Sequence, residues 1–479
     1  HGQIEGYVEK YGMEYRRAYW DEAIDWDLVH RHEDHIFPLM RKRHIFSSAG
    51  SFAFFDFVAP EGWVDENVFV YTNRAGNERA LIVYNNAYTT PRGTIRLSTA
   101  INAGSVEEPY LVRRSLGEAL ALNTEDTCYY IARDHRAGLE YLFYARDLAE
   151  NGFALDLVEY QFCAFTEWRE LHDFDFTWGK LHEALGGRGV HSVDDAYQEL
   201  NLKSLLEPFR RSVNAETISR LAQDPADAET FAHYTREMTA FLDIAAERLG
   251  DAARPEAPEE MFAAVAADLE HLRQFRDGLA ASGHYPELCE YIESGLPKPG
   301  VPLEKKLAFW RIPITWALTR HIGLLVAPPE DAERIRATSA AWLGEWYLAK
   351  QIQRMFRDLD GDAKRAEDDA RLLTVAMRDG ERLLALQTDT WAPHLDKLLR
   401  GPGAGDYLRL HYFGGRNYIN KEQLENLLHA CLLLLVLEVP RPDDTQADAL
   451  MLALEDANIL LETAGDMGYD LDAMVNVTK

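Results

Sequence analysis

The spacing of hydrophobic and polar residues divides the chain into three regions. Up to residue 46, apolar residues recur near helical spacing. From 47 to 165, short runs rich in Val, Ile, Tyr and Phe alternate with polar residues, and from 166 to 479 apolar residues recur three or four positions apart over long stretches. A period near 3.6 is typical of an amphipathic helix, and a period of two is typical of a half-buried strand. The pattern therefore predicts a helical segment 1–46, a β domain 47–165 and an α-helical domain 166–479.

The β region contains repeated strand patterns with no helical pattern between them. Turn sequences such as RAGN (74–77), TTPRG (89–93) and DHRAG (134–138) separate the apolar runs. Regular short strands joined by such turns favour antiparallel pairing, and alternation buries one face of each sheet. We therefore expect an antiparallel β-sandwich, and the overall fold class is α+β with several domains.

The chain is strongly acidic. Its 479 residues include 50 Lys and Arg against 79 Asp and Glu, a net charge of −29. Nucleic acids and anionic membranes attract basic surfaces, so we expect neither as a partner. The longest apolar run, Leu427–Val439, is shorter than the roughly 20 residues that span a membrane. The cysteines form no CxxC pair, which favours buried, reduced thiols in a cytoplasmic protein. They are Cys128, Cys163, Cys289 and Cys431.

A histidine-rich segment, HRHEDHIF, is the first candidate for chemistry. Zinc proteases place two histidines four positions apart on one helix face, with a glutamate between them. Here His32 and His35 are three positions apart, in the pattern HExH, and His30 precedes them. We interpret the segment as a polar helix surface and predict no metal site. A metal-dependent hydrolase built on His30–His35 is kept as a third hypothesis.

Two further segments resemble ligand loops without completing one. DLDGDAKRAEDD, from Asp358, clusters carboxylates as an EF-hand does, but its glycine comes before three ligand positions are in place. GPGAGD, at 401–406, has the glycines of a phosphate loop, but Pro402 lacks an N–H and no lysine follows. We interpret both as loops between helices and predict no cofactor.

Aromatic residues are frequent, at 11% of the chain. Trp63, Tyr71 and Tyr88 lie beside predicted turns of the β domain. Aromatic rings can stack on sugar rings, so each is a candidate sugar platform, although core packing explains most aromatic residues. Spacing alone reveals no complete catalytic constellation in the sequence.

The start of the chain resembles a known family. HGQIEG followed by GMEYRR is similar to the segment after the last barrel strand in α-amylase-superfamily proteins, glycoside hydrolase family 13. HIFPLMRKRHIFS resembles that family's last barrel helix, and NVFVYTNRAGNERALIVYNN resembles the sandwich domain that follows it. GRNYINKEQLENLL, at 415–428, resembles a segment in the helical extension of a bacterial branch. The resemblance covers mainly the first 165 residues.

The resemblance implies both a fold and a function. Residues 1–46 would be the terminal turn and helix of a (β/α)8 barrel. The chain would be the C-terminal portion of an α-amylase-like glycosidase or glucanotransferase. Such enzymes act on α-glucans by a retaining mechanism with two carboxylates about 5–5.5 Å apart. Those carboxylates are expected upstream of His1, so no catalytic residue is assigned and the chain alone is predicted to be inactive.

Two residues near the start are candidates for contact with the sugar. Gln3 and Glu5 lie near the position of a substrate-facing loop in the family, so the resemblance implies that they bind substrate. Capping of the following helix is the structural alternative. The alternative function is a non-catalytic glucan-binding or protein-assembly module.

Overall fold

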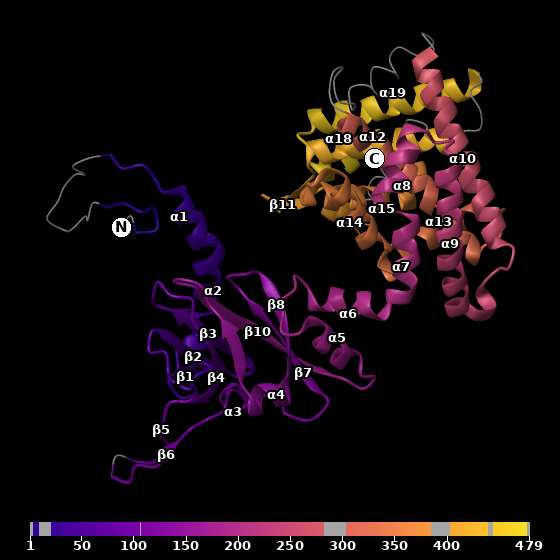
Figure 1. Ribbon diagram of the computed structural model, residues 1–479. Coiled ribbons are helices and arrows are strands. Elements are labelled where there is room, and N and C mark those ends of the chain that lie inside the picture. The colour runs from indigo at the N-terminus through magenta and orange to yellow at the C-terminus, as the bar shows by residue number, and fades with distance from the viewer. Residues whose placement is uncertain are drawn as a thin grey trace. The chain divides into compact units, whose positions relative to one another are not determined.

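The computed structural model describes the chain in six stretches (Figure 1). They are residues 3–8, 21–105, 107–281, 303–384, 403–438 and 444–476. The chain forms two compact units, His1–Asn201 and Leu202–Lys479. In the described residues, the first unit combines a large β-sheet with short helices, and the second is helical apart from one hairpin.

Short helical turns precede the sheet of the first unit. They are α1 (Trp26–Arg31), a π-helical turn (His32–Ile36), α2 (Phe37–Arg41) and a 3-10 turn (Arg43–Phe46). Asp25 caps α1, because its side chain accepts a hydrogen bond of 3.0 Å from the backbone N–H of Leu28. No residue of α1, the π-helical turn or α2 is buried, and Ile45 alone is buried in the 3-10 turn.

Eight antiparallel strands form one sheet in the order β8-β7-β10-β3-β2-β1-β4-β9. Phe55, Val70 and Val83 are direct cross-strand neighbours, and each is at most 1% exposed. These three residues show that every second side chain along a strand points to the same face of the sheet, which here is buried. The strands are β1 (Ala53–Val58), β2 (Val68–Ala75), β3 (Glu78–Asn85), β4 (Arg92–Ser98), β7 (Cys128–Asp134), β8 (Leu139–Tyr144), β9 (Phe153–Asp156) and β10 (Phe162–His172). A separate pair is formed by β5 (Ile101–Asn102) and β6 (Leu111–Val112).

The sheet curls so that side chains of its two edge strands come into contact. Phe143 on edge strand β8 and Phe153 on edge strand β9 pack edge-to-face, with ring centroids 5.2 Å apart. Helices α3 (Leu116–Leu120) and α4 (Ala145–Glu150) cover the inner face, and their leucines join the core of the sheet. The sheet is therefore a half-barrel with a single continuous core.

The expected β-sandwich is wrong. A sandwich needs a second sheet packed on the first, whereas this single sheet closes its inner face by curling and by packing under two helices. Alternation along a strand indicates that one face is buried but does not indicate what covers it. The covering helices have five and six residues, which is too short for a helical period to stand out in the sequence.

The predicted (β/α)8 barrel remnant at 1–46 is also wrong. Such a barrel alternates parallel strands with helices, whereas the strand pairs in the described residues are all antiparallel. A helix on the outside of a barrel buries one face against the strands, but α1 and α2 bury no residue. Ile24 and Ile36, which fit the helical period, are 37% and 39% exposed.

Two helices that follow the sheet belong to the first unit. They are α5 (Thr177–Leu185) and α6 (Val193–Asn201). Leu181 and Val193 pack with Tyr129, Ile131 and Leu142 in a small cluster of their own. Because Cys128 and Tyr130 of the same strand belong to the inner core, this cluster lies on the outer face of β7 and β8.

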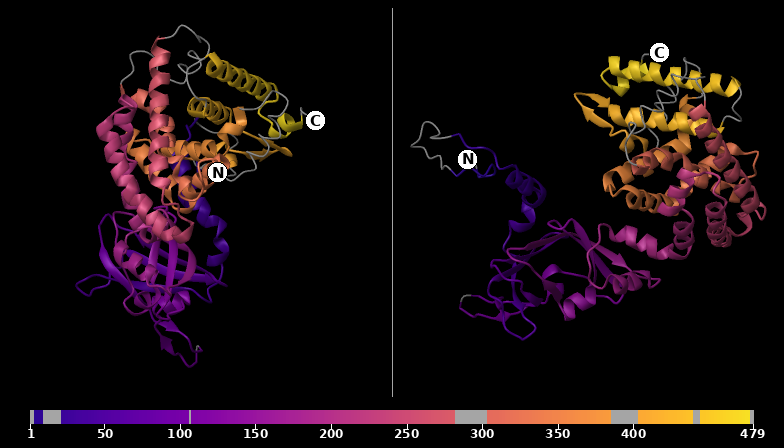
Figure 2. Two further views of the ribbon diagram at one scale, coloured as in Figure 1. Left: turned by 90° about the vertical axis from the view of Figure 1, so that its right-hand side faces the viewer. Right: turned by 45° about the horizontal axis from the view of Figure 1, so that its top comes forward.

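The predicted helical domain is confirmed in the second unit (Figure 2). Two large apolar clusters form its core. None of the helices in the described stretches is both long and apolar enough to cross a membrane. The helices are α7 (Lys203–Ser212), α8 (Ala215–Gln223), α9 (Ala228–Leu249), α10 (Ala257–Ala281), α12 (Leu303–Thr319), α13 (Ala332–Glu345), α14 (Leu348–Asp360), α15 (Ala363–Leu384), α17 (Ala404–Tyr407), α18 (Lys421–Glu438), α19 (Asp444–Asp466) and α20 (Leu471–Asn476), and the hairpin is β11 (His411–Phe413) with β12 (Arg416–Tyr418).

Candidate functional site

Three loops of the first unit meet at one end of its sheet. β2 begins where β3 ends, since Val68 pairs with Asn85. β10 begins at the same end, since Phe162 pairs with Tyr84. The strand register therefore brings together loops that are far apart in the sequence. They are 59–67 between β1 and β2, 86–91 between β3 and β4, and 157–161 between β9 and β10.

One buried side chain ties two of these loops together. Asn85 is fully buried, and its amide nitrogen donates to the carbonyl of Thr89 at 2.8 Å and to that of Val158 at 3.0 Å. Its amide oxygen accepts from the backbone N–H of Ala87 at 3.1 Å. The backbone N–H of Tyr160 also donates to the carbonyl of Ala87, at 3.2 Å. Loops 86–91 and 157–161 are therefore held in one fixed arrangement.

Each of the three loops exposes a large aromatic ring. Trp63 is 55% exposed, Tyr88 is 78% exposed and Tyr160 is 57% exposed. The rings of Tyr88 and Tyr160 are neighbours, with centroids 6.3 Å apart and planes 47° apart. Tyr160 has a φ of +52°, in the left-handed region that costs an L-residue about 1–2 kcal/mol. Strain of this kind is retained where the surrounding hydrogen bonds impose it, and it is concentrated at binding sites.

Two of these loops also carry exposed amide side chains. The side chains of Asn67 and Asn86 are exposed, and the backbone N–H of Asn86 donates to the carbonyl of Asn67 at 2.8 Å. Each amide offers both a donor and an acceptor, which is what recognition of a hydroxyl group needs. This end of the sheet therefore combines exposed rings with hydrogen-bonding groups.

Tyr71, the remaining aromatic candidate, has a different environment. It lies on the outer face of β2, where Phe46 and Phe52 pack against its ring with centroids 6.4 and 5.7 Å away. Burial raises the pKa of its phenol. Tyr71 therefore contributes to packing between the 3-10 turn and the sheet rather than to an open ring surface.

Sequence spacing missed Tyr160. The run FALDLVEYQFCAF predicts one continuous strand, but the structure divides it into β9 and β10 with the loop 157–161 between them. Gln161 marks the break, because its side-chain oxygen accepts from the backbone N–H of Val158 at 2.9 Å. No proline or glycine signals this turn, so the sequence offers little to detect it.

Gln3 and Glu5, the predicted substrate-binding residues, lie in a short turn at the start of the chain. Gln3 is exposed and Glu5 is half-buried. The carbonyl of Glu5 accepts from the backbone N–H of Asp25 at 3.0 Å. The side chain that caps α1 is that of Asp25, not of Glu5. Contact of these two residues with sugar stays a prediction.

The histidines of HRHEDHIF are engaged separately. The Nδ1 atom of His32 bonds to the carbonyl of Leu28 at 2.8 Å. His35 packs edge-on against Phe162 at 6.2 Å. Within the described stretches, none of these histidines belongs to a group of three potential metal ligands. They therefore offer no converging set of donors for a metal-dependent hydrolase.

The acidic run from Asp358 provides counter-ions for a buried cation. Arg311 is 1% exposed and forms ion pairs with Asp360, at 2.6 Å, and with Asp369. Its guanidinium also lies over the ring of Phe356, 5.1 Å from the centroid. A buried charge needs such partners. The structure thus gives the run a packing role, and of GPGAGD the residues Gly401 and Pro402 lie outside the described stretches.

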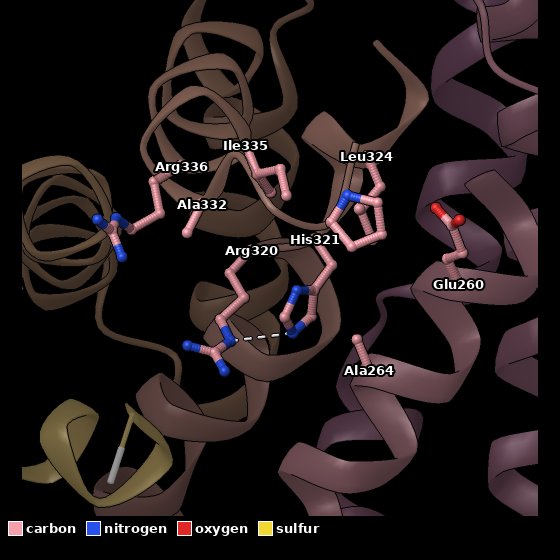
Figure 3. A pocket seen from close by; sticks show the side chains of 9 residues that line it. Glu260, Ala264, Arg320, His321, Leu324, Ala332, Ile335 and Arg336 are labelled. Carbon is pink, nitrogen blue, oxygen red and sulfur yellow. Dashed lines mark hydrogen bonds between the residues drawn. The ribbon is translucent and has the colours of Figure 1, made fainter. Parts of the chain in front are cut away.

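The second unit contains a small pocket of about 230 Å³ (Figure 3). Arg320 binds the buried carboxylate of Asp268 with two hydrogen bonds of 2.7 Å, and Nε2 of His321 lies 2.8 Å from the same carboxylate. Burial alone would raise the pKa of Asp268, but His321 and Arg320 outweigh it and hold that pKa below its ordinary value. The residues that line the pocket are Glu260, Ala264, Arg320, His321, Leu324, Pro329, Ala332, Ile335 and Arg336.

The charges around this pocket are largely satisfied within the protein. Glu260 receives two hydrogen bonds from Arg254, at 2.7 and 3.0 Å. Arg320 is held by Asp268 and stacks over Trp316, 4.3 Å from the ring centroid. The Arg320–Asp268 pair joins the residue after α12 to α10, whereas Arg254 and Glu260 both lie near the start of α10. Since these charges have partners within the protein, the pocket is a weaker candidate for ligand binding than the aromatic loops.

Comparison of the chain with protein-family models, with curated proteins and with solved structures gave no match. The α-amylase resemblance therefore stays a prediction from the sequence, and the site must be interpreted from its own geometry.

Proposed function

We propose that the first unit is a non-catalytic glucan-binding module and that Trp63, Tyr88 and Tyr160 form its sugar platform. The observation that carries the proposal is the exposed pair Tyr88 and Tyr160 on loops that Asn85 holds together. The resemblance to α-amylase-superfamily proteins supports α-glucan as the ligand class.

Physical chemistry supports this use of the three rings. Trp and Tyr are enriched among the few residues that carry most of the binding energy at interfaces, and each can bury about 150–250 Å². Loops that are already ordered lose little conformational entropy on binding, so more of the contact energy remains as affinity. The exposed amides of Asn67 and Asn86 can exchange hydrogen bonds with sugar hydroxyls.

Two further predictions rest on the sequence. One is hydrolysis or transfer of α-glucan, which rests only on the resemblance. We also propose a cytoplasmic location, which is supported by three free, buried cysteines, Cys128, Cys163 and Cys431.

Titration of the full chain with maltoheptaose, together with a pull-down on insoluble starch, tests the proposal. Substitution of Trp63, Tyr88 or Tyr160 by Ala should each weaken binding about tenfold, which corresponds to about 1.4 kcal/mol. Tyr110→Ala is the matched control, because Tyr110 is also exposed, at 67%. The strand β4 begins at the end of the sheet that carries the three rings, and Tyr110 comes after the opposite end of that strand.

Two results would overturn the glucan-binding proposal. One is no binding of maltoheptaose by the wild-type chain. The other is equal loss of affinity in Tyr110→Ala and in the platform variants, since that would indicate a general effect of exposed tyrosines. Retention of starch binding in all three platform variants would place the ligand elsewhere on the chain.

A further inference from the structure

A second group of side chains converges where β7 begins and β10 ends. Cys128 is the first residue of β7, His172 is the last residue of β10, and the two are paired across the antiparallel strands. The backbone N–H of Cys128 donates to the carbonyl of Glu125 at 2.9 Å, which closes a turn ahead of β7. The strand register and this turn therefore bring three chemically different side chains together.

The donor atoms of this group lie close to one another. The Sγ atom of Cys128 is 3.6 Å from Nδ1 of His172. One donor atom from each of Glu125, Cys128 and His172 lies within 4.8 Å of the other two. Cys128 is buried in the inner core, whereas Glu125 and His172 are exposed, so the group lies at the boundary between the core and the surface.

These distances fit a tetrahedral metal centre. Zinc binds thiolate sulfur at about 2.3 Å and imidazole nitrogen at about 2.0–2.1 Å. At the tetrahedral angle those two bonds place sulfur and nitrogen about 3.5–3.6 Å apart, which matches the separation of Cys128 and His172. The exposed Glu125 side chain can supply the third ligand, because one of its oxygens lies within 4.8 Å of both other donor atoms.

The far side of the histidine has the partner that a metal ligand requires. Nε2 of His172 lies 3.3 Å from Oε1 of Glu170. Glu170 is itself fixed, because it accepts from the hydroxyl of Tyr130 at 2.6 Å and from the amide of Asn123 at 3.3 Å. Metal-binding histidines usually donate their second N–H to a carboxylate, which orients the ring and leaves the first nitrogen free for the metal.

We propose that Glu125, Cys128 and His172 bind one Zn²⁺ ion, with a water molecule completing the tetrahedron. Sulfur, nitrogen and oxygen donors together suit zinc better than the oxygen-preferring ions Mg²⁺ and Ca²⁺. Binding forms a zinc–sulfur bond and releases the thiol proton to solvent. Thiolate and carboxylate then neutralise the two charges of the ion, and the ion links the turn before β7 to the end of β10.

Cobalt substitution tests the coordination directly. The full chain, stripped of metal with a chelator, is titrated with Co²⁺, and the near-ultraviolet charge-transfer band of a cobalt–thiolate bond is recorded. One equivalent should produce the band, and one equivalent of Zn²⁺ should abolish it. Zn²⁺ should also raise the Tm of the stripped chain, because an ion that binds only the folded state stabilises it.

Variants separate this site from other thiols. Cys128→Ser should lose the band, whereas Cys163→Ser, which changes another buried thiol, should keep it. Glu170→Gln keeps all three ligands and should weaken zinc affinity about 10- to 100-fold. Should Cys128→Ser fail to fold, Glu170→Gln and Glu125→Gln still test the site. Absence of the band in the wild-type chain would overturn the proposal. So would a Cys128→Ser variant, or a pair of glutamate variants, that shows the band and binds the metal with unchanged affinity. Either result would leave Cys128 and His172 as a simple hydrogen-bonded pair.

Discussion

Asn85→Ala should separate the two loops that carry Tyr88 and Tyr160. The Asn85 side chain is fully buried and makes three hydrogen bonds to the backbones of these loops. A hydrogen bond contributes about 1 kcal/mol net to stability. A buried backbone group that is left without a partner costs more than this, unless water takes the partner's place. Water can reach a loop at the end of a sheet, so we expect the free energy of loop opening to fall by about 2–3 kcal/mol. That change corresponds to roughly 30- to 150-fold faster amide exchange in loops 86–91 and 157–161.

Hydrogen exchange measured by mass spectrometry resolves this local effect. Peptides that cover the two loops should lose protection, while those from the centre of β2 and β3 should keep it. Maltoheptaose affinity should fall in parallel, because Tyr88 and Tyr160 would no longer be ordered before binding. Asn151→Ala is the control, since Asn151 is exposed and its amide contacts only a neighbouring side chain in the described structure. Wild-type exchange in both loops of the Asn85 variant would show that the Asn85 side chain does not hold them together.

Four further substitutions test the packing. Arg311→Met should destabilise the second unit by about 3–5 kcal/mol in urea unfolding, because it leaves two aspartates without their buried partner. Asp268 has a lowered pKa, so its carboxylate stabilises the fold above its unfolded pKa of about 3.9, and this stability is lost as pH falls through the lower folded value. Asp268→Asn should therefore lower Tm at neutral pH and flatten its decrease below about pH 4. Gly152→Ala should destabilise the sheet by more than about 2 kcal/mol, because φ is +81° and the new Cβ would lie 2.2 Å from a backbone oxygen. Gly187→Ala, with φ of +79° and open space around it, should cost only about 1 kcal/mol.

Local pattern predicted the elements of the fold better than their assembly. Alternation along β2 and β3 identifies both strands and the turn at RAGN, because these depend on residues close in sequence. Closure of the sheet depends on Phe143 meeting Phe153 and on two helices of only five and six residues. Neither leaves a periodic signal, so the sequence favoured the commoner sandwich. At the start of the chain, helical spacing predicted helices but could not show that they bury no residue.

Part of the candidate site could be predicted from the sequence. Trp63 and Tyr88 lie beside recognisable turns, and both are exposed in the structure. Tyr160 lies in an apolar run that reads as a strand, and its position depends on contacts with a loop about 70 residues away, such as that between Asn85 and Val158. Cys128 and His172 are 44 positions apart, and only the pairing of β7 with β10 brings them together. Residues that meet through strand register cannot be paired from spacing alone.

The two proposed sites lie at opposite ends of β10, and this separation makes them independent. Tyr160 precedes the first residue of β10, and His172 is its last residue. The eleven residues of β10, at about 3.3 Å each, span at most roughly 33 Å between their two ends, and a register shift between Thr166 and Arg169 shortens this span. Perturbations so far apart, with no shared partner, should add without coupling. Removal of zinc should therefore lower Tm and leave maltoheptaose affinity unchanged, whereas Tyr160→Ala should weaken maltoheptaose binding and leave the cobalt–thiolate band intact. Coupling between the two readouts would mean that β10 does not act as a rigid spacer, and would require a conformational change of the whole sheet.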